Sequence, residues 1–178
     1  NMAITKSKIP AQNIDFCFAG DLLNQCISSS FGLRELNIPF FGIFGACSTF
    51  VEGLCLGSVF IDGNAASNVI CAASSHFCSA EKQFRFPVEY GAIRKRVNTC
   101  TASGSVSVLL SNKMSNLKVE SATIGYVVQT NHKDANDMGS AIAPSCAEVI
   151  HNHLESTGRN YKYYDLILTG DLGIYGTK

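Results

Sequence analysis

The predicted fold is built around one stretch of the chain, Phe41-Gly-Ile-Phe-Gly-Ala-Cys-Ser-Thr-Phe-Val-Glu-Gly-Leu-Cys-Leu-Gly-Ser-Val-Phe-Ile61. An apolar run ends in the small-residue turn Gly45-Ala46-Cys47-Ser48-Thr49. Apolar or small residues at helical spacing then follow as far as Ile61. The stretch therefore predicts a strand, a tight turn and a helix.

The predicted turn gives Cys47 a distinctive chemical position. At the start of a helix, unpaired backbone N–H groups and the positive end of the helix dipole favour a thiolate or a bound anion. Glu52 is the only charged residue between Cys47 and Ile61, so we expect the helix to be buried on nearly all sides. Gly53 and Gly57 lie on one face of this helix and predict that a second element packs closely there.

The composition restricts the class of protein. With 178 residues, of which 46% are hydrophobic, the chain can bury a core of about one domain. The formal net charge is zero, so no strong electrostatic field draws the chain to nucleic acid. We interpret the cluster Arg94-Lys95-Arg96 as a solvated loop. No stretch is apolar for the roughly 18 residues that a membrane span requires, and no signal peptide is recognisable.

The eight cysteines include no C-x-x-C pair. Several stand in apolar patterns, where a free cysteine behaves as a small hydrophobic residue. We therefore expect reduced, mostly structural cysteines and a reducing compartment. His151 and His153 could bind zinc together with a cysteine, but an H-x-H pair at the end of a helical pattern is usually solvent-facing. We expect no metal site.

The order of the predicted elements indicates an α/β layer fold. We expect a lead-in at residues 1–10, an irregular insertion at 81–98 and a loop at 131–140. Because strands and helices alternate over the first part of the chain, parallel strand pairing is expected. The predicted strands cover residues 14–21, 40–44, 67–76, 105–110 and 121–129; the predicted helices cover 22–36, the stretch after the cysteine turn, and a helix that Ala143-Pro144 opens and Gly158 ends.

One segment occurs twice. Tyr164-Asp-Leu-Ile-Leu-Thr-Gly-Asp-Leu172 repeats Ile14-Asp-Phe-Cys-Phe-Ala-Gly-Asp-Leu22, and each copy predicts a strand that begins after Asp and ends in Gly-Asp-Leu. A repeat at such a distance suggests a duplicated α/β half. We assign residues 1–130 to the later part of a first half and residues 131–178 to the incomplete start of a second half. We therefore expect the chain to be a fragment.

The duplicated unit with a cysteine at a strand-to-helix turn resembles the thiolase-like superfamily. The motif Gly45-Ala-Cys-Ser-Thr-Phe50 is similar to the nucleophile motif of the ketoacyl synthase III branch. Together with further segments, it resembles the stage V sporulation protein AD family of spore-forming Firmicutes. These further segments are Ala19–Gln25, Ala73–His76, Glu81–Gly91, Asn136–Gly139 and Tyr163–Gly173.

The resemblance implies a duplicated thiolase-like α/β/α layer fold in a longer protein. It implies binding of dipicolinic acid, for uptake of calcium dipicolinate into the developing spore. It also implies a homodimer, formed through a first-half strand flanked by the cysteine loop, and peripheral association with the spore inner membrane through the other, membrane-embedded stage V sporulation A proteins. No resident cofactor is expected, although calcium can accompany the ligand.

Four residues are candidates for the ligand site: Asp21, Cys47, Ser75 and His76. Each follows a predicted strand end, and open α/β sheets bind ligands at the carboxyl ends of their strands. A helix N-terminus with hydroxyl, thiol and imidazole groups suits a planar dianion. Two alternatives stay open: Asp21 can be the N-cap of a helix that starts at Leu22, and His76 can be buried in its strand. Asp171 is interpreted as a cap that matches Asp21.

Acyl transfer with Cys47 as nucleophile is the alternative function. It requires a histidine for proton transfer and an oxyanion hole. Ketoacyl synthase III relatives carry a histidine in an H-Q-A-N turn after the first strand of the second half, whereas the corresponding turn here is Thr169-Gly-Asp-Leu-Gly173. The G-D-G-A-G-like segment of such enzymes is also altered, to Thr101-Ala-Ser-Gly-Ser105. We therefore expect no enzyme activity.

Overall fold

The structure is a computed structural model that describes residues 2–84 and 93–178. Its chain divides into two compact units. Unit 1 comprises Asn1–Ala80 and Thr101–Glu120, and unit 2 comprises Glu81–Cys100 and Ser121–Lys178. The helices are α1 (Met2–Ser7), α2 (Ile27–Leu33), α3 (Thr49–Asp62), α4 (Phe77–Phe84), α5 (Met138–Thr157) and α6 (Gly173–Gly176), and the strands are β1 (Phe16–Asp21), β2 (Phe40–Gly42), β3 (Asn68–Ser75) and β4 (Gly104–Ser111).

Unit 1 is built on a four-stranded sheet in the order β2-β1-β3-β4. Strands β2, β1 and β3 are parallel, and β4 runs antiparallel to β3. The predicted α/β fold and its parallel pairing are confirmed for the first three strands. Strand β4 pairs with β3 along its full length, from Gly104 opposite Ser75 to Ser111 opposite Asn68.

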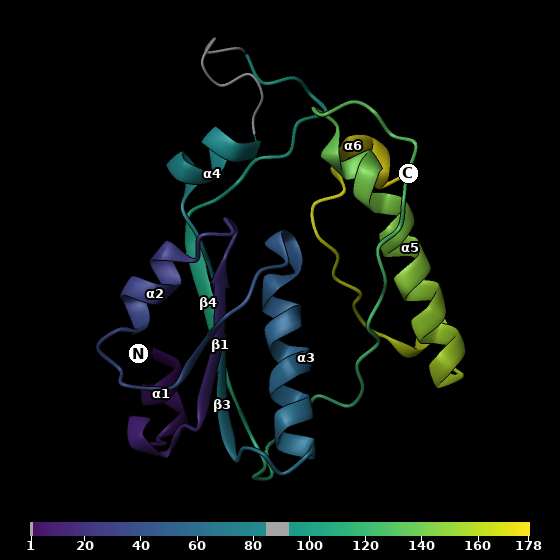
Figure 1. Cartoon of the computed structure of the whole chain (residues 1–178). Coiled ribbons are helices and arrows are strands. Elements are labelled where there is room, and N and C mark those ends of the chain that lie inside the picture. Colours follow the sequence, from purple (N-terminus) through teal and green to yellow (C-terminus); the bar gives the residue numbers. More distant parts are fainter. Residues whose placement is uncertain (1, 85–92) are drawn as a thin grey trace. The chain divides into compact units, whose positions relative to one another are not determined.

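The two faces of this sheet carry different helices (Figure 1). Helix α3 packs on the face formed by Phe18, Val69 and Cys71, while α1 and α2 lie over the other face. Gly53 and Gly57 let α3 approach the sheet, because a Cβ atom at Gly57 would lie 2.9 Å from Cys71 Sγ. The prediction that a second element packs against these glycines is therefore confirmed.

Helix α3 begins and ends where the sequence indicates, since Gly63 follows its last residue, Asp62. The expectation that α3 is buried on nearly all sides is wrong. Val51 is 57% exposed and Val59 is 63% exposed. The helix buries the face with Thr49, Gly53 and Gly57 against the sheet of unit 1. The low charge of α3 is therefore not a sign that every face of the helix is buried.

Two predicted helix starts and the lead-in need correction. Residues 2–7 form α1, and Ile4 packs against the core cluster of β1 and β3. Helix α2 starts at Ile27 instead of Leu22, because the Leu22 N–H still donates to the Ser74 carbonyl and keeps the chain extended beyond β1. Helix α5 starts at Met138, well before Ala143-Pro144, because the Asp137 carboxylate caps it by accepting from the Ser140 N–H.

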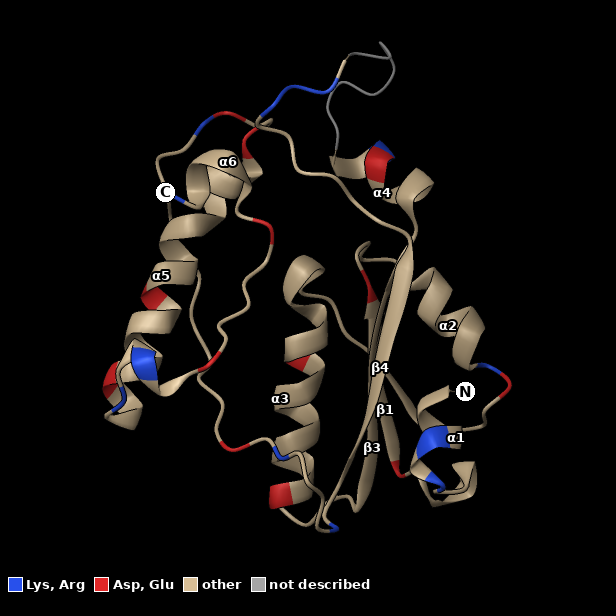
Figure 2. Cartoon of the chain, turned by 180° about the vertical axis from the view of Figure 1, so that it is seen from behind, with Lys and Arg blue, Asp and Glu red and all other residues tan. Residues whose placement is uncertain are grey.

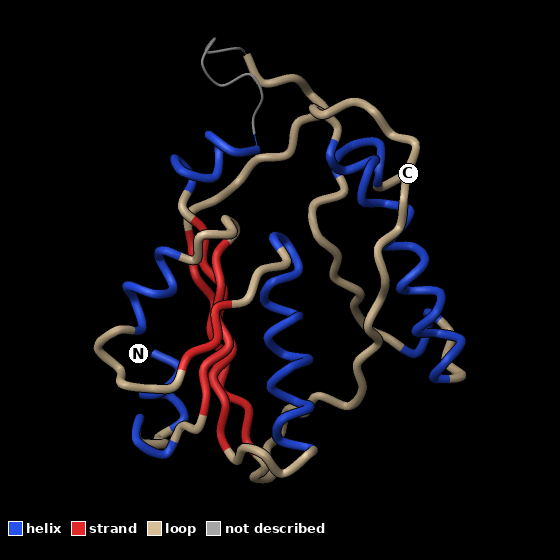
Figure 3. Tube along the Cα trace, in the orientation of Figure 1, coloured by secondary structure: helices blue, strands red, loops and turns tan. Residues whose placement is uncertain are grey.

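Two predicted strands of unit 2 are absent from the described structure. Residues 121–129 and 164–169 have no strand assignment and are drawn as loops in Figure 3. A strand needs a hydrogen-bonded partner, and neither segment has one in this structure. In the first segment, side chains bond to α5 instead: Thr123 Oγ1 lies 2.7 Å from His153 Nδ1, and Tyr126 donates to Glu148.

Among the remaining predictions, the end of α5 is confirmed, whereas the division into halves is untested and the insertion is only partly described. The Gly158 end of α5 is confirmed, with Gly158 at φ 65° in the left-handed region. The division at residue 130 concerns duplicated halves, and the two compact units do not test it. In the predicted insertion, residues 81–84 belong to α4 and residues 85–92 lie outside the described residues. All eight cysteines are free thiols, of which Cys17, Cys26 and Cys71 are buried.

Candidate functional site

Cys47 lies in a short turn that leads directly into α3. Ala46–Ser48 form one turn of 3-10 helix, and α3 follows at Thr49. The turn closes on itself, because the Ser48 N–H and the Ser48 hydroxyl both donate to the Gly45 carbonyl, at 3.0 Å and 2.8 Å. Cys47 is exposed. The thiol is therefore placed at the start of α3, as predicted, and is open to solvent.

The turn is seated over the end of β1 by a close backbone approach at Gly20. A Cβ atom at Gly20 would lie 2.0 Å from the Ile43 carbonyl oxygen and 2.7 Å from Thr49 Cγ2. The Ile43 N–H in turn donates to the Ala19 carbonyl at 3.0 Å. Only glycine leaves room for this contact. Gly20 and Thr49 were not singled out from the sequence; the glycine of the repeated Gly-Asp pair was the available signal.

Asp21 is fully engaged inside unit 1. It is 5% exposed. One carboxylate oxygen accepts from the Ser28 N–H at 2.9 Å and the Ser29 N–H at 3.4 Å. The other accepts from the Ser29 hydroxyl at 2.8 Å and from the Ser74 hydroxyl. Asp21 thus caps α2, although it is not adjacent to this helix in sequence. A capping role for Asp21 was one of the two alternatives from the sequence, but the capped helix starts at Ile27 and not at Leu22.

The pleat of the sheet separates Asp21 from Ser75. Asp21 pairs with Ser74 across β1 and β3, so both side chains lie on the α2 face. Ser75 follows Ser74 and shares the opposite face with Cys71, which packs beneath α3. The four predicted site residues therefore share one end of the sheet but not one face: Ser75 lies on the α3 side, where the Cys47 turn is seated.

Three buried oxygen atoms have no hydrogen-bond partner among the described residues: Glu52 Oε2 and Ser58 Oγ on α3, and Ser75 Oγ at the end of β3. Glu52 Oε2 lies beside the cysteine turn, 3.0 Å from the position of a Cβ atom on Gly45. Helix α3 carries acidic residues but no basic ones (Figure 2). Unpaired buried oxygen atoms are costly, so they are sites where a ligand or water can supply a hydrogen bond.

His76 follows β3 and is exposed. It makes no hydrogen bond to Cys47 within residues 2–84 and 93–178. The structure therefore does not bury His76 in its strand and does not join it to the thiol. Proton transfer between the two has no geometric support within the described part of the chain.

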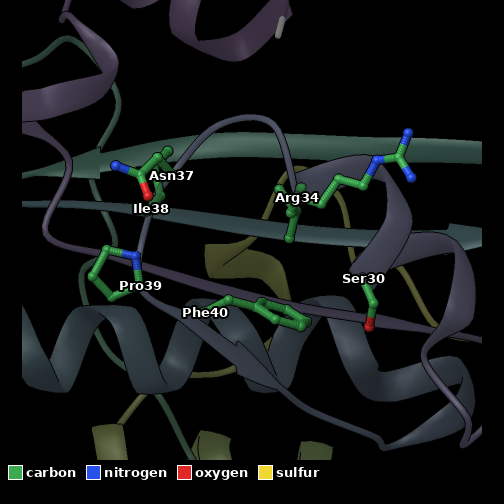
Figure 4. A pocket seen from close by; sticks show the side chains of 7 residues that line it. Ser30, Arg34, Asn37, Ile38, Pro39 and Phe40 are labelled. Carbon is green, nitrogen blue, oxygen red and sulfur yellow. The ribbon is translucent and has the colours of Figure 1, made fainter.

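A cavity of about 440 Å³ lies elsewhere in unit 1 (Figure 4). Its walls come from α2, the following loop and β2, and contain none of the four predicted site residues. The lining residues are Ser30, Leu33, Arg34, Asn37, Ile38, Pro39 and Phe40.

In unit 2, the turn at 169–173 is the one that the sequence resemblance matches to a histidine turn, and it lies directly before α6. Asp171 accepts from the Gly173 N–H at 2.9 Å, so it caps the start of α6, as expected for a match to Asp21. The turn packs tightly against the start of α5, because a Cβ atom at Gly139 would lie 2.0 Å from the Leu172 carbonyl oxygen. The Asn136–Gly139 motif thereby has a packing role.

His153 is not solvent-facing, contrary to the sequence expectation. Its two ring nitrogens lie 2.7 Å from Thr123 Oγ1 and 2.6 Å from the Tyr164 hydroxyl. Arg159 also donates to the Tyr164 hydroxyl. His151 remains largely exposed and lies 3.4 Å from Glu155. Both nitrogens of His153 are therefore used within unit 2.

The chain matches the stage V sporulation protein AD family over residues 1–178. It is 42% identical over 177 residues to the stage V sporulation protein AD of Bacillus subtilis (strain 168), a match that covers 99% of this chain and 52% of that protein. The chain thus spans about half the length of this curated relative.

Among solved structures, the chain is similar to 3-oxoacyl-[acyl-carrier-protein] synthase III from Aquifex aeolicus VF5, with a TM-score of 0.62 and 16% identity over 89% of this chain and 54% of that one. It is also similar to AbyA1, a tetronic acid condensing enzyme, with a TM-score of 0.61 and 12% identity over 89% of this chain and 56% of that one. These matches establish a thiolase-like α/β fold of the ketoacyl synthase III type.

Proposed function

This chain belongs to the stage V sporulation protein AD family, and on that premise we propose that it supplies one wall of a binding site for dipicolinic acid. The ligand would bind at the carboxyl end of the unit 1 sheet, on the α3 side. As a member of this family it is a protein of sporulation stage V. Binding without catalysis is the function that we infer for it.

The exposed Cys47 turn without a proton-transfer partner is the observation that carries the proposal. The turn presents a thiol at the start of the 14-residue helix α3, whose dipole and unpaired N–H groups favour a dianion. His76 makes no hydrogen bond to that thiol within the described residues, and the turn at 169–173 contains no histidine. The same place therefore suits ligand binding better than acyl transfer.

The unpartnered oxygen of Ser75 supports the same location. A serine hydroxyl can donate to a ligand carboxylate, and Ser75 Oγ has no partner among the described residues. Asp21, by contrast, has its carboxylate committed to four hydrogen bonds on the α2 face. We therefore assign the ligand contacts to Cys47, Ser75 and His76, and a scaffolding role to Asp21.

The test is a calorimetric titration of dipicolinate, with and without calcium, into the full-length protein. We expect saturable binding that Cys47→Ala and Ser75→Ala each weaken about fivefold, which corresponds to a hydrogen bond of about 1 kcal/mol. Cys100→Ala is the control, because it removes a different exposed thiol of the same chain. Folded wild-type protein that gives no binding heat would contradict the proposal.

Acyl transfer remains the second candidate because Cys47 is exposed at the start of α3 and the fold matches a synthase. Incubation with acyl-CoA followed by mass spectrometry separates the two functions. We expect no acyl adduct on Cys47. A stable adduct lost in Cys47→Ala would favour the enzyme.

We also propose a homodimer through β2 and peripheral association with the spore inner membrane by way of the membrane-embedded stage V sporulation A proteins. Strand β2 is one of the two edge strands of the sheet, and its three residues are exposed, so its outer backbone edge supports pairing. No helix in the described residues is long and apolar enough to cross a membrane. Sedimentation of the full-length protein, with Phe41→Glu as the variant, tests the dimer.

A further inference from the structure

Thr49 is a buried polar residue at the start of α3 whose hydroxyl is used entirely on the Cys47 turn. It is 1% exposed. Its Oγ1 accepts from the Gly45 N–H at 3.0 Å and donates to the Ala46 carbonyl at 2.9 Å. These two backbone groups span Gly45 and Ala46, the two residues immediately before Cys47. A single side chain therefore holds the turn on both sides of Ala46.

The methyl group of Thr49 fixes the same turn to the sheet. Its Cγ2 lies 2.7 Å from the position that a Cβ atom on Gly20 would occupy. The methyl group thus rests on the glycine at the end of β1. Thr49 has two separable functions: packing through its methyl group and hydrogen bonding through its hydroxyl.

The turn needs such a restraint because Ala46 has an unfavourable backbone conformation. Its φ of 50° lies in the left-handed region, which costs a residue with a side chain about 1–2 kcal/mol. Such a conformation persists only where surrounding interactions hold it. The Ser48 N–H and hydroxyl hold the Gly45 carbonyl on one side of Ala46, and the Thr49 N–H holds the Ala46 carbonyl on the other. The Thr49 hydroxyl is the side-chain group that bonds to the Ala46 carbonyl itself, and it also holds the Gly45 N–H.

We propose that Thr49 is a positioning residue whose hydroxyl holds Ala46 in its left-handed conformation and thereby sets how the Cys47 thiol is presented. Without the hydroxyl, Ala46 relaxes toward negative φ and the thiol changes its orientation at the start of α3. The reactivity of Cys47 then changes. The effect on ligand affinity rests on the proposed function, whereas the effect on thiol reactivity does not.

The experiment measures the alkylation rate of Cys47 by iodoacetamide as a function of pH, resolved by mass spectrometry, in the full-length protein. Thr49→Val keeps the shape of the side chain and removes both hydrogen bonds. We expect it to change the Cys47 rate at least fivefold, since each lost hydrogen bond is worth about 1 kcal/mol, and to shift the pH profile. Thr49→Ser, which retains the hydroxyl, should stay within about twofold of wild type.

Two controls accompany these variants. Thr157→Val removes a hydroxyl that donates to the His153 carbonyl in unit 2, and it should leave the Cys47 rate unchanged. Cys100, an exposed thiol, provides an internal standard in every sample. Because alkylation needs no ligand, failure of dipicolinate binding would leave this test intact.

Thr49→Ser and Thr49→Ala decide the question if Thr49→Val does not fold. Both lack the methyl group and differ only by the hydroxyl. The proposal expects the serine variant to react like wild type and the alanine variant to differ at least fivefold from it. Equal rates and equal pH profiles for these two variants, or a folded Thr49→Val with the wild-type profile, would overturn it and leave Thr49 a packing residue only.

Discussion

The two copies of the repeated segment have different structures despite their similar sequences. The first copy, residues 14–22, contains β1, which lies between β2 and β3 in the sheet. The second copy, residues 164–172, contains no strand and exposes its apolar side chains. The comparison shows that the sequence pattern sets a local preference for an extended chain, while partner strands decide whether that chain becomes a buried strand.

The aspartates of the two copies differ in whether their hydrogen bonds reach neighbouring or distant residues in the sequence. Asp21 and Asp171 both accept backbone N–H groups of the segment that follows. Asp15 accepts from Ser67 and Asn68, residues far along the chain, whereas Asp165 makes no hydrogen bond within the described residues. Capping is therefore common to both copies, and only the first copy has long-range bonds.

The largest expected difference between the copies concerns their central apolar residues. Phe18 is 2% exposed and Leu168, at the matching position, is 82% exposed. Phe18→Ala should lower the free energy of unfolding by about 3–5 kcal/mol because it leaves a cavity. Leu168→Ala should change it by less than about 0.5 kcal/mol. Denaturant unfolding followed by circular dichroism measures both, and a cost above 2 kcal/mol for Leu168→Ala would contradict the comparison.

The glycines of the two copies give the next largest difference. Gly20→Ala places a methyl group against the Ile43 carbonyl and should cost about 1–3 kcal/mol. Gly170 is exposed, so Gly170→Ala should cost a few tenths at most. The midpoints of denaturant unfolding compare the two variants. Equal midpoints would show that the cysteine turn is not seated on Gly20.

The last predicted difference between the copies depends on pH. Burial raises the pKa of the Cys17 thiol in the first copy from 9.0 to about 11. Between these values the unfolded chain loses a proton that the folded chain keeps, so stability falls as pH rises above 9, by about 1.4 kcal/mol per pH unit for this thiol. Cys17→Ala should reduce the slope by that amount, because it removes the titrating thiol. The second copy has no such thiol, since Ile167 stands at the matching position. Cys71 keeps a slope of its own in the variant, because burial raises its pKa to about 12. Identical slopes in unfolding measured from pH 9 to 11 would exclude this explanation.

The local elements of unit 1 could be predicted from the sequence because their signals are local. The cysteine turn, α3 and the end of this helix at Asp62 follow from small residues, apolar spacing and Gly63. The strand of the first copy follows from its apolar run. The start of α2 could not be predicted, because Leu22 stays extended through a bond to Ser74, which is distant in sequence.

The site was only partly predictable for the same reason. That Cys47 lies at a helix start is a local property of its turn. The separation of Asp21 from Ser75 depends on the pairing of Asp21 with Ser74, and strand register is not visible in a single sequence. The seating of Thr49 on Gly20 likewise depends on how two distant segments pack. Contacts of this kind decide which residues meet at the site.

The most direct test of the central claim measures whether dipicolinate protects Cys47 from alkylation in the full-length protein. The claim is that the ligand binds on the α3 side of the sheet, against the Cys47 turn. It predicts that saturating dipicolinate slows alkylation of Cys47 and leaves alkylation of Cys100 unchanged. Dipicolinate that binds, as calorimetry would show, while Cys47 is alkylated at the ligand-free rate would contradict it.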